Sequence, residues 1–209
     1  MKRVVVFDWG GVLMRTVDYR PRHAWDRRLG LPAGSVEAVV HGIPAWAEAQ
    51  RGETPLEVYW EAVRRELDLT AEELAALQRD FYSGDRLDEN LVALLRGLKR
   101  DGMPLGLLSN NSLDLRETLT TLDLDGLFDA CVISAEIGVM KPDPEAYHAI
   151  LERLGVPSDE ALLVDDSAEN IEGARAVGMQ AIHFTPGLNL RPLLEKWRKG
   201  LWQTRKNEG

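Results

Sequence analysis

The sequence has 209 residues, 44% of them apolar and 28% charged, which suits one sizeable domain or a core with a modest second unit. Its formal charge of −9 opposes nucleic-acid binding, because no segment of the predicted folded region gathers basic residues on one face. The first apolar run ends at Asp8, too early for a signal peptide or a membrane span, and the single cysteine, Cys131, excludes an internal disulfide. We expect a cytoplasmic protein with no nucleic-acid or membrane partner.

Short apolar runs recur along the sequence, and several are followed by helical periodicity. Each is too short for a helix and is predicted to be a buried parallel strand. The runs cover residues 4–7, 105–108, 130–133, 162–164 and 181–184. Strands that alternate with helices indicate an α/β fold, here a Rossmann-like parallel sheet whose ligand site lies at the carboxyl ends of the strands.

Residues 15–86 carry helical patterns without a strand signal. An apolar stripe over residues 56–67 follows Thr54 and Pro55, which we expect as N-cap and first-turn residues. A second helix is expected from about Thr70, with Glu73 completing a capping box, to residue 84. The stretch is too long for an ordinary crossover. We therefore predict a helical cap over residues 15–86, inserted into a core made of residues 1–14 and 87–209.

Substrate choice is expected to depend on this cap. It contains four large aromatic residues that could shape a pocket, although packing inside a core is the commoner role for each. They are Trp25, Trp46, Tyr59 and Trp60.

The first candidate for chemistry is Asp8, which closes the first strand and is followed by Gly10 and Gly11. An aspartate at a strand end can attack phosphorus and form an aspartyl-phosphate, provided that a cation screens its charge from the anionic substrate. The glycines would let the backbone approach that cation closely. Taken alone, the pattern more often describes an aspartate that caps the next turn.

Two further motifs supply groups that could hold a phosphoryl group. Ser109 and Asn110 directly follow the run at residues 105–108. A hydroxyl group and backbone amides before a helix can bind phosphate, or they can simply cap that helix. Lys141, followed by Pro142, could supply a fixed positive charge to the nucleophile and the phosphoryl group, whereas a lone lysine is usually a surface residue.

The last motif is the adjacent pair Asp165 and Asp166 at the end of the run at residues 162–164. Two neighbouring carboxylates repel each other, so burying them near Asp8 makes sense chiefly with a divalent cation between them. Oxygen ligands with open water positions suit Mg²⁺. Asp166 or Ser167 could instead cap the following helix, which would leave the second acid unexplained.

In their order, these motifs resemble the four-motif signature of the haloacid dehalogenase superfamily over nearly the whole sequence. The segments FDWGGVL, LLSNNS, GVMKPDPEAY and VDDSAENIEGARAVGM look like their counterparts in members with a helical C1 cap. Among those members are the glucose-1-phosphate phosphatases and the phosphatase domain of soluble epoxide hydrolases. The resemblance implies a Mg²⁺-dependent phosphatase that hydrolyses a small phosphorylated metabolite, a sugar phosphate or similar, through an aspartyl-phosphate. The sequence leaves monomer and homodimer open.

The resemblance also implies a metal site. Asp8 would be the nucleophile and a Mg²⁺ ligand, with the Gly10 carbonyl as a backbone ligand. Asp166 would be the second acidic ligand, and Asp165 would lie among the ligands or just outside them.

For the substrate, the resemblance implies that Ser109 and Asn110 hold the phosphoryl oxygens and that Lys141 pairs with the nucleophile and the transferring group. The sequence departs from the family at Gly10, where most phosphatases carry a second aspartate as general acid and base. General acid catalysis contributes about 10²–10⁴-fold, so Gly10 predicts a slow enzyme, a good leaving group or an acid from elsewhere, with Asp18 as one candidate.

Other functions fit less well. A 2-haloacid dehalogenase would use the same aspartate, but that family normally lacks the paired acids and has tyrosine where Gly10 stands. A phosphomutase would need the missing acid to return a proton. A catalytically impaired member that binds a phosphorylated metabolite or a partner protein stays open because of Gly10. No G-x-G-x-x-G follows the first strand, so a nucleotide-dependent oxidoreductase is poorly supported.

Overall fold

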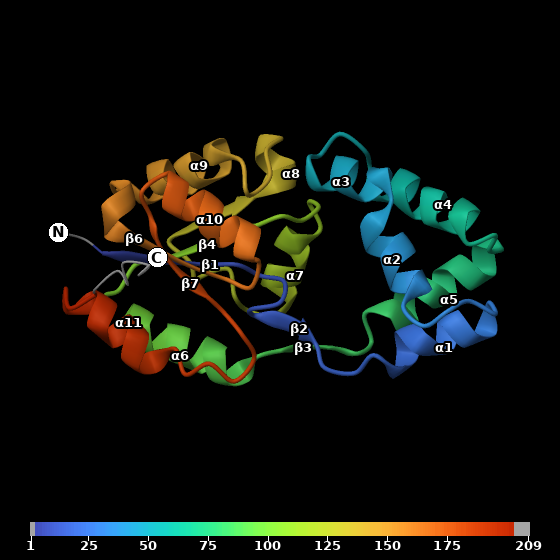
Figure 1. Cartoon of the computed structure of the whole chain (residues 1–209), viewed down its shortest axis with the longest axis horizontal. Coiled ribbons are helices and arrows are strands. Elements are labelled where there is room, and N and C mark those ends of the chain that lie inside the picture. The colour runs from blue at the N-terminus through green and yellow to red at the C-terminus, as the bar shows by residue number, and fades with distance from the viewer. Residues whose placement is uncertain (1–2, 203–209) are drawn as a thin grey trace, which may run out of the picture.

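The computed structural model describes residues 3–202, and a five-stranded parallel sheet lies at the centre of one half of the molecule (Figure 1). The strand order is β5-β4-β1-β6-β7. The strands are β1 (Val4–Phe7), β4 (Leu105–Ser109), β5 (Ala130–Ile133), β6 (Ala161–Asp165) and β7 (Gln180–His183). They coincide with the predicted runs to within a residue, which confirms the predicted α/β fold.

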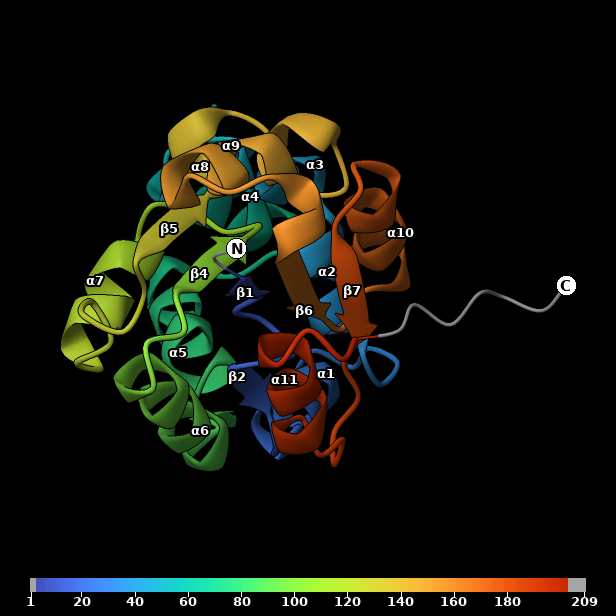
Figure 2. The ribbon, with the colours of Figure 1, turned by 90° about the vertical axis from the view of Figure 1, so that its left-hand side faces the viewer.

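Helices cover both faces of this sheet, and β1 shows how they divide it. Val5 and Phe7 point into one hydrophobic cluster and Val4 and Val6 into the other, because successive side chains of a strand face opposite ways. Figure 2 shows α9 and α10 on one side of the strands and α6 and α11 on the other. The helices of this half are α6 (Glu89–Arg100), α7 (Leu115–Thr121), α8 (Ser134–Ile137), α9 (Pro144–Leu154), α10 (Ala168–Ala176) and α11 (Arg191–Arg198), with a 3₁₀ turn at Ser158–Glu160.

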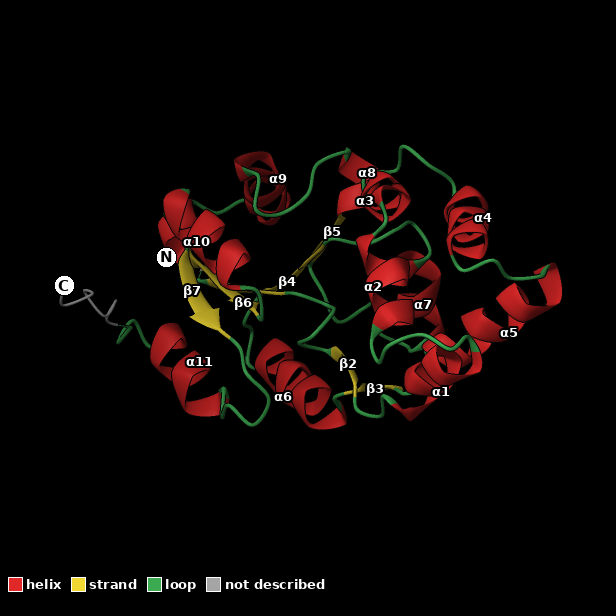
Figure 3. Ribbon diagram, turned by 45° about the vertical axis from the view of Figure 1, so that its right-hand side comes forward, coloured by secondary structure: helices red, strands yellow, loops and turns green. Residues whose placement is uncertain are grey.

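Five helices between the first and second strands of the sheet form a separate group, called here the helical insert (Figure 3). They pack on a hydrophobic cluster of their own that includes Trp25, Val40, Tyr59, Leu77 and Phe81, all buried. The helices are α1 (Arg20–Arg28), α2 (Ser35–Gly42), α3 (Pro44–Gln50), α4 (Leu56–Glu66) and α5 (Ala71–Phe81). Each buries one apolar stripe against the others, as amphipathic helices do.

A two-stranded antiparallel ribbon joins the insert to the sheet-bearing half. It pairs β2 (Met14–Thr16) with β3 (Asp85–Leu87). The expectation of no strand within residues 15–86 was therefore wrong. These three-residue strands are not buried and have no apolar alternation, so the sequence carries no strand signal for them. The ribbon lies where the cap was predicted to begin and end; the exact division into core and cap stays a prediction, and residues 1–2 and 203–209 of that core lie outside the described residues.

Two helix ends of the insert test the capping predictions. The capping box of Thr70 and Glu73 is confirmed, with the Glu73 backbone N–H donating to Thr70 Oγ1 and the Thr70 backbone N–H donating to Glu73 Oε2. That helix ends at Phe81, short of residue 84. Thr54 is not an N-cap: α4 begins after Pro55, and the Thr54 hydroxyl donates to Glu48 instead. Within residues 3–202 no helix has the length and apolar character needed to cross a membrane.

Candidate active site

The carboxyl edge of the sheet gathers the predicted acidic residues around one lysine. Asp8 follows β1, Asp165 ends β6, and Lys141 stands in the loop before α9. Lys141 Nζ lies 2.9 Å from Asp8 Oδ1 and 2.6 Å from Asp165 Oδ2, and its side chain has no exposed surface. Because parallel strands end at the same edge, Asp8 and Asp165 meet here although they are 157 positions apart in the sequence.

Burial makes this cluster electrostatically unusual. Burial raises the pKa of Asp8 to about 7, although the charge of Lys141 acts to lower it. Burial alone would lower the pKa of Lys141, but the charges of Asp8 and Asp165 outweigh it and raise that pKa, so the ammonium stays protonated. Partial loss of solvent around its carboxyl, together with the nearby charge of Asp165, also raises the pKa of Asp166, an exposed residue at the edge of the cluster. The cluster therefore holds more carboxylates than its single ammonium can balance.

Asp165 is held by hydrogen bonds on both of its oxygens. Oδ1 accepts from the Ser167 backbone N–H at 2.8 Å, and Asn170 Nδ2 lies 3.0 and 3.1 Å from the two oxygens. Oδ2 also accepts from Lys141 at 2.6 Å. With its oxygens so occupied, Asp165 fixes the position of Lys141, a role that suits a residue just outside a metal's ligands.

Asn110 also positions Lys141, through the lysine backbone. Its side-chain Oδ1 accepts from the Lys141 N–H at 2.8 Å, and its Nδ2 donates to the Lys141 carbonyl at 2.8 Å. Ser109, at the end of β4, is buried next to it. The predicted phosphoryl contacts of Ser109 and Asn110 stay predictions, but the Asn110 amide already has both of its functional atoms bonded within the protein.

A cation would fit beside these residues. Ligand oxygens of Asp8, Asp165 and Asp166 lie within 4.8 Å of one another. A Cβ at Gly11, where φ is +73°, would lie 1.9 Å from Asp166 Oδ2, so glycine is needed for the Asp166 carboxylate to occupy this place. Carboxylate oxygens are the ligands that a hard divalent cation prefers, and its charge would balance the excess of carboxylates over the one ammonium here.

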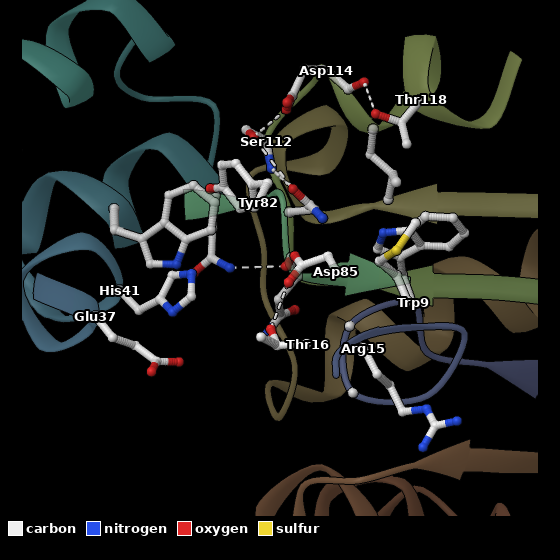
Figure 4. A pocket seen from close by; sticks show the side chains of 18 of the residues that line it. Trp9, Arg15, Thr16, Glu37, His41, Tyr82, Asp85, Ser112, Asp114 and Thr118 are labelled. Carbon is white, nitrogen blue, oxygen red and sulfur yellow. Dashed lines mark hydrogen bonds between the residues drawn. The ribbon is translucent and has the colours of Figure 1, made fainter. Parts of the chain in front are cut away.

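A cavity of about 920 Å³ opens from this edge of the sheet to the helical insert (Figure 4). Gly10, Gly11 and Asp166 line its inner end, and residues of α2, α3 and α4 line the far side. Gln50 of the insert donates from Nε2 to the Asn110 carbonyl at 2.9 Å, which ties the insert to the loop that holds Lys141. The volume lies within the range of about 300–1,000 Å³ that small-molecule pockets occupy.

The four aromatic candidates divide between cavity and core. Trp46 and Trp60 line the cavity, whereas Trp25 and Tyr59 are buried in the cluster of the insert. Sequence reasoning missed Tyr82, which also lines the cavity and follows α5. It missed Asn170 as well, although its place one turn into the helix after the acid pair is a signal, because such a residue can reach back to the strand end.

Asp18 is poorly suited to donate a proton. Its carboxylate accepts from the Arg20 side chain at 2.7 to 3.0 Å, and the Arg20 hydrogen bonds lower its pKa to about 2. The group is therefore ionised at neutral pH. Gly10 itself leaves open space, because a Cβ at that position would meet nothing within 4 Å.

Comparisons with known proteins agree with this architecture. A family model described as haloacid dehalogenase-like hydrolase matches residues 2–178. Phosphatase MT3486 of Mycobacterium tuberculosis (strain CDC 1551 / Oshkosh) is 35% identical over 187 residues, which cover 85% of this chain and 84% of that protein. The sesquiterpene phosphatase astK of Aspergillus oryzae is 30% identical over 190 residues, covering 89% of this chain and 91% of that protein.

Among solved structures, a haloacid dehalogenase family enzyme of Bacteroides thetaiotaomicron has a similar fold. Its wild-type form, in complex with magnesium and inorganic phosphate, superposes with a TM-score of 0.75. The alignment covers 92% of this chain and 99% of that one at 19% sequence identity. At this identity the likeness concerns the fold.

Proposed function

Since this chain belongs to the haloacid dehalogenase-like hydrolases, an enzyme family with phosphatases among its relatives, we propose that it is a Mg²⁺-dependent phosphatase. It would hydrolyse a small phosphate monoester through an aspartyl-phosphate on Asp8. One observation carries the proposal: Lys141 lies within ion-pair distance of Asp8 in a cluster of three carboxylates, one of which, Asp166, lines the inner end of the cavity. The cytoplasmic location and the choice between monomer and homodimer belong to the same proposal.

Asp8, Asp166 and the Gly10 carbonyl would hold the metal. Asp165, whose oxygens are already bonded, would act mainly on Lys141. When bound, Mg²⁺ would screen the charge of the nucleophile from the anionic substrate and polarise the phosphoryl group as a Lewis acid.

The residues of the chain then divide the reaction as follows. An oxygen of Asp8 attacks phosphorus, and the bond from phosphorus to the alcohol oxygen breaks, so that the alcohol leaves with the electron pair. Lys141, fixed by Asp165 and Asn110, presents a positive charge to the negative charge that develops on the transferring group. Water hydrolyses the aspartyl-phosphate, which releases inorganic phosphate and restores Asp8.

With glycine at position 10, the chain lacks the aspartate that in most phosphatases of the family protonates the leaving alcohol. Asp18 does not replace it, because its ion pair with Arg20 keeps it ionised. The proposed enzyme is therefore slower on esters of weakly acidic alcohols than on esters of acidic ones.

The substrate class in this proposal is broad. Sugar phosphates or similar metabolites follow from the sequence resemblance, and one relative is named for a sesquiterpene. The phosphate esters of such different alcohols have in common only the phosphoryl group, which is the part of the substrate that the acidic cluster and Lys141 would bind.

Hydrolysis of p-nitrophenyl phosphate tests the proposal. We expect turnover with Mg²⁺, its loss in excess EDTA with recovery on adding Mg²⁺, and no turnover by Asp8→Asn, which keeps the size of the side chain but is a far weaker nucleophile. Normal turnover in EDTA or in Asp8→Asn would reject the metal-assisted aspartyl mechanism. Inactivity across a broad panel of phosphate esters, with retained ligand binding, would favour an impaired member that binds rather than hydrolyses.

Release of halide from a 2-haloacid, without cleavage of phosphate esters, would instead support the dehalogenase alternative. The paired acids beside Asp8 argue against it, because displacing halide from carbon needs no divalent cation. Gly10, at the position where 2-haloacid dehalogenases normally have tyrosine, argues the same way.

A further inference from the structure

The cavity has a second end, away from the acidic cluster, that the proposed chemistry does not use. This end is formed by the helical insert and its connecting segments (Figure 4). Whatever alcohol is attached to a phosphoryl group at Asp8 would extend into it, because the cavity is continuous from Gly10 and Gly11 to the insert.

Aromatic rings dominate the far side of this cavity. Trp46, Trp60 and Tyr82, called here the aromatic wall, all line it. Tyr59 lies fully buried behind them, with its ring centroid 5.0 Å from that of Trp46 and 4.9 Å from that of Trp60. The rings of Trp60 and Tyr82 meet edge to face at 6.3 Å. This packing fixes the three wall rings with one surface turned to the cavity.

Apolar surface is left exposed along the same cavity. The described residues include seven large hydrophobic side chains that are exposed, and three of these line the cavity: Val17 at 60%, Tyr19 at 44% and Tyr82 at 43%. Scattered exposed apolar residues are ordinary, but several that line one concave site favour an apolar ligand.

The charged side chains of the far side are already paired with one another. Arg22 is buried, donates to Glu37 at 2.7 Å and to Asp85 at 3.0 Å, and also donates to the Phe81 carbonyl. The Thr16 hydroxyl donates to the Asp85 carboxylate at 2.7 Å, as Figure 4 shows.

Ser112 and Asp114 are likewise hydrogen bonded to each other. Within residues 3–202, the one buried side-chain nitrogen or oxygen that lacks a partner is Arg15 Nε. A substrate with hydroxyl groups at these positions would compete with the existing pairs for their donors and acceptors, which leaves polar groups without a partner at a cost in binding free energy.

We infer that the leaving alcohol of the substrate is a bulky hydrocarbon, branched or ringed, that packs against Trp46, Trp60 and Tyr82 while its phosphate group lies at Asp8. The inference rests on the proposed phosphatase function and narrows it from phosphate monoesters in general to those of apolar alcohols. A sugar phosphate would leave the three rings of the aromatic wall without an apolar group to pack against.

A matched pair of substrates tests this inference. Citronellyl phosphate and glucose 6-phosphate are both monoesters of primary alcohols, so the absence of a general acid at Gly10 affects them alike. We expect kcat/KM for citronellyl phosphate to be at least about tenfold higher, since each hydrocarbon group packed in such a site contributes about 10–200-fold. Equal values, or a preference for glucose 6-phosphate, would overturn the inference.

Variants then locate the preference. Tyr82→Ser and Trp60→Ser should lower the ratio of the two kcat/KM values by about tenfold. Val58→Ser is the matched control, because Val58 is 56% exposed on the same helix as Trp60 and does not line the cavity. Tyr82 is 43% exposed, so its replacement tests the wall even where Trp60→Ser does not fold. An unchanged ratio in Tyr82→Ser would overturn the role given to the wall.

Binding separates this inference from the proposed function. Calorimetric titration of Asp8→Asn with each phosphate needs no turnover, and we expect citronellyl phosphate to bind at least about tenfold more tightly, with a negative heat-capacity change. If no ester is hydrolysed but this difference in binding holds, the proposed function fails and the apolar site stands. If esters are hydrolysed but the two ligands bind equally, the function stands and the apolar site is rejected.

Discussion

The replacement of Gly11 by alanine tests the cation site through one methyl group. The new Cβ would lie 1.9 Å from Asp166 Oδ2, whereas ordinary contacts begin near 3.4 Å, so the carboxylate or the loop must move by about 1.5 Å. A misplacement of about 1 Å in an active site can cost about 10²-fold in rate. The left-handed backbone at Gly11, with φ of +73°, adds about 1–2 kcal/mol of strain for alanine. We expect kcat to fall at least about 10²-fold and Mg²⁺ affinity to weaken.

Gly102→Ala is the control for that strain. Gly102 has φ of +80° in the turn after α6, and a Cβ there meets nothing within 4 Å. Urea unfolding should show a loss of about 1–2 kcal/mol in both variants, but kcat with p-nitrophenyl phosphate and Mg²⁺ should fall in Gly11→Ala alone. A Gly11→Ala protein that is folded and retains the wild-type kcat would refute the placement of Asp166 beside the nucleophile.

Three further changes probe neighbouring parts of the account. Lys141→Met leaves Asp8 and Asp165 buried without the ammonium that both contact. We expect the free energy of unfolding in urea to fall by about 3–5 kcal/mol and turnover to be lost. An unaltered unfolding midpoint would contradict this. Gly10→Asp introduces a carboxyl group that can protonate the leaving alcohol, at a position where a Cβ meets nothing within 4 Å. We expect kcat on glucose 6-phosphate to rise about 10²-fold and kcat on p-nitrophenyl phosphate, whose leaving group needs no proton, to change little. Gly10→Asn, which cannot donate a carboxylic proton, should show no gain. Burial raises the pKa of the Cys131 thiol to about 11 from the usual 9.0, which lowers the fraction of reactive thiolate. At pH 8, iodoacetamide should therefore react about 100-fold more slowly with the folded protein than with the protein in urea. Equal rates would show that the thiol is not shielded.

The sheet could be predicted because its strands are covered on both faces. Such strands are continuous apolar runs, and the run at residues 4–7 has no exposed side chain at all. The meeting of Asp8 and Asp165 follows from the same reasoning, since strand ends of a parallel sheet lie at one edge. Lys141 stands in the loop between α8 and α9, so no strand end places it, and only the family resemblance indicated its position.

Other features depend on long-range packing that single residues do not reveal. β2 and β3 are too short and too exposed to show a period, and form because the two ends of the insert meet. Tyr59 and Trp60 are neighbours in the sequence, yet one is buried behind the cavity and the other lines it, because they face different sides of α4. The Asn110 side chain forms hydrogen bonds with the Lys141 backbone because two loops meet, and nothing in the sequence shows that these loops are neighbours.

The most direct test of the central claim is to find where phosphate resides during turnover. The protein would be mixed with Mg²⁺ and acetyl phosphate, quenched in acid within milliseconds, digested, and mapped by mass spectrometry. We predict one added phosphoryl group on the peptide that contains Asp8, absent when Mg²⁺ is omitted and absent in Asp8→Asn. Turnover with the phosphoryl group on another residue, or with none trapped at any time point, would contradict the assignment of Asp8 as the nucleophile.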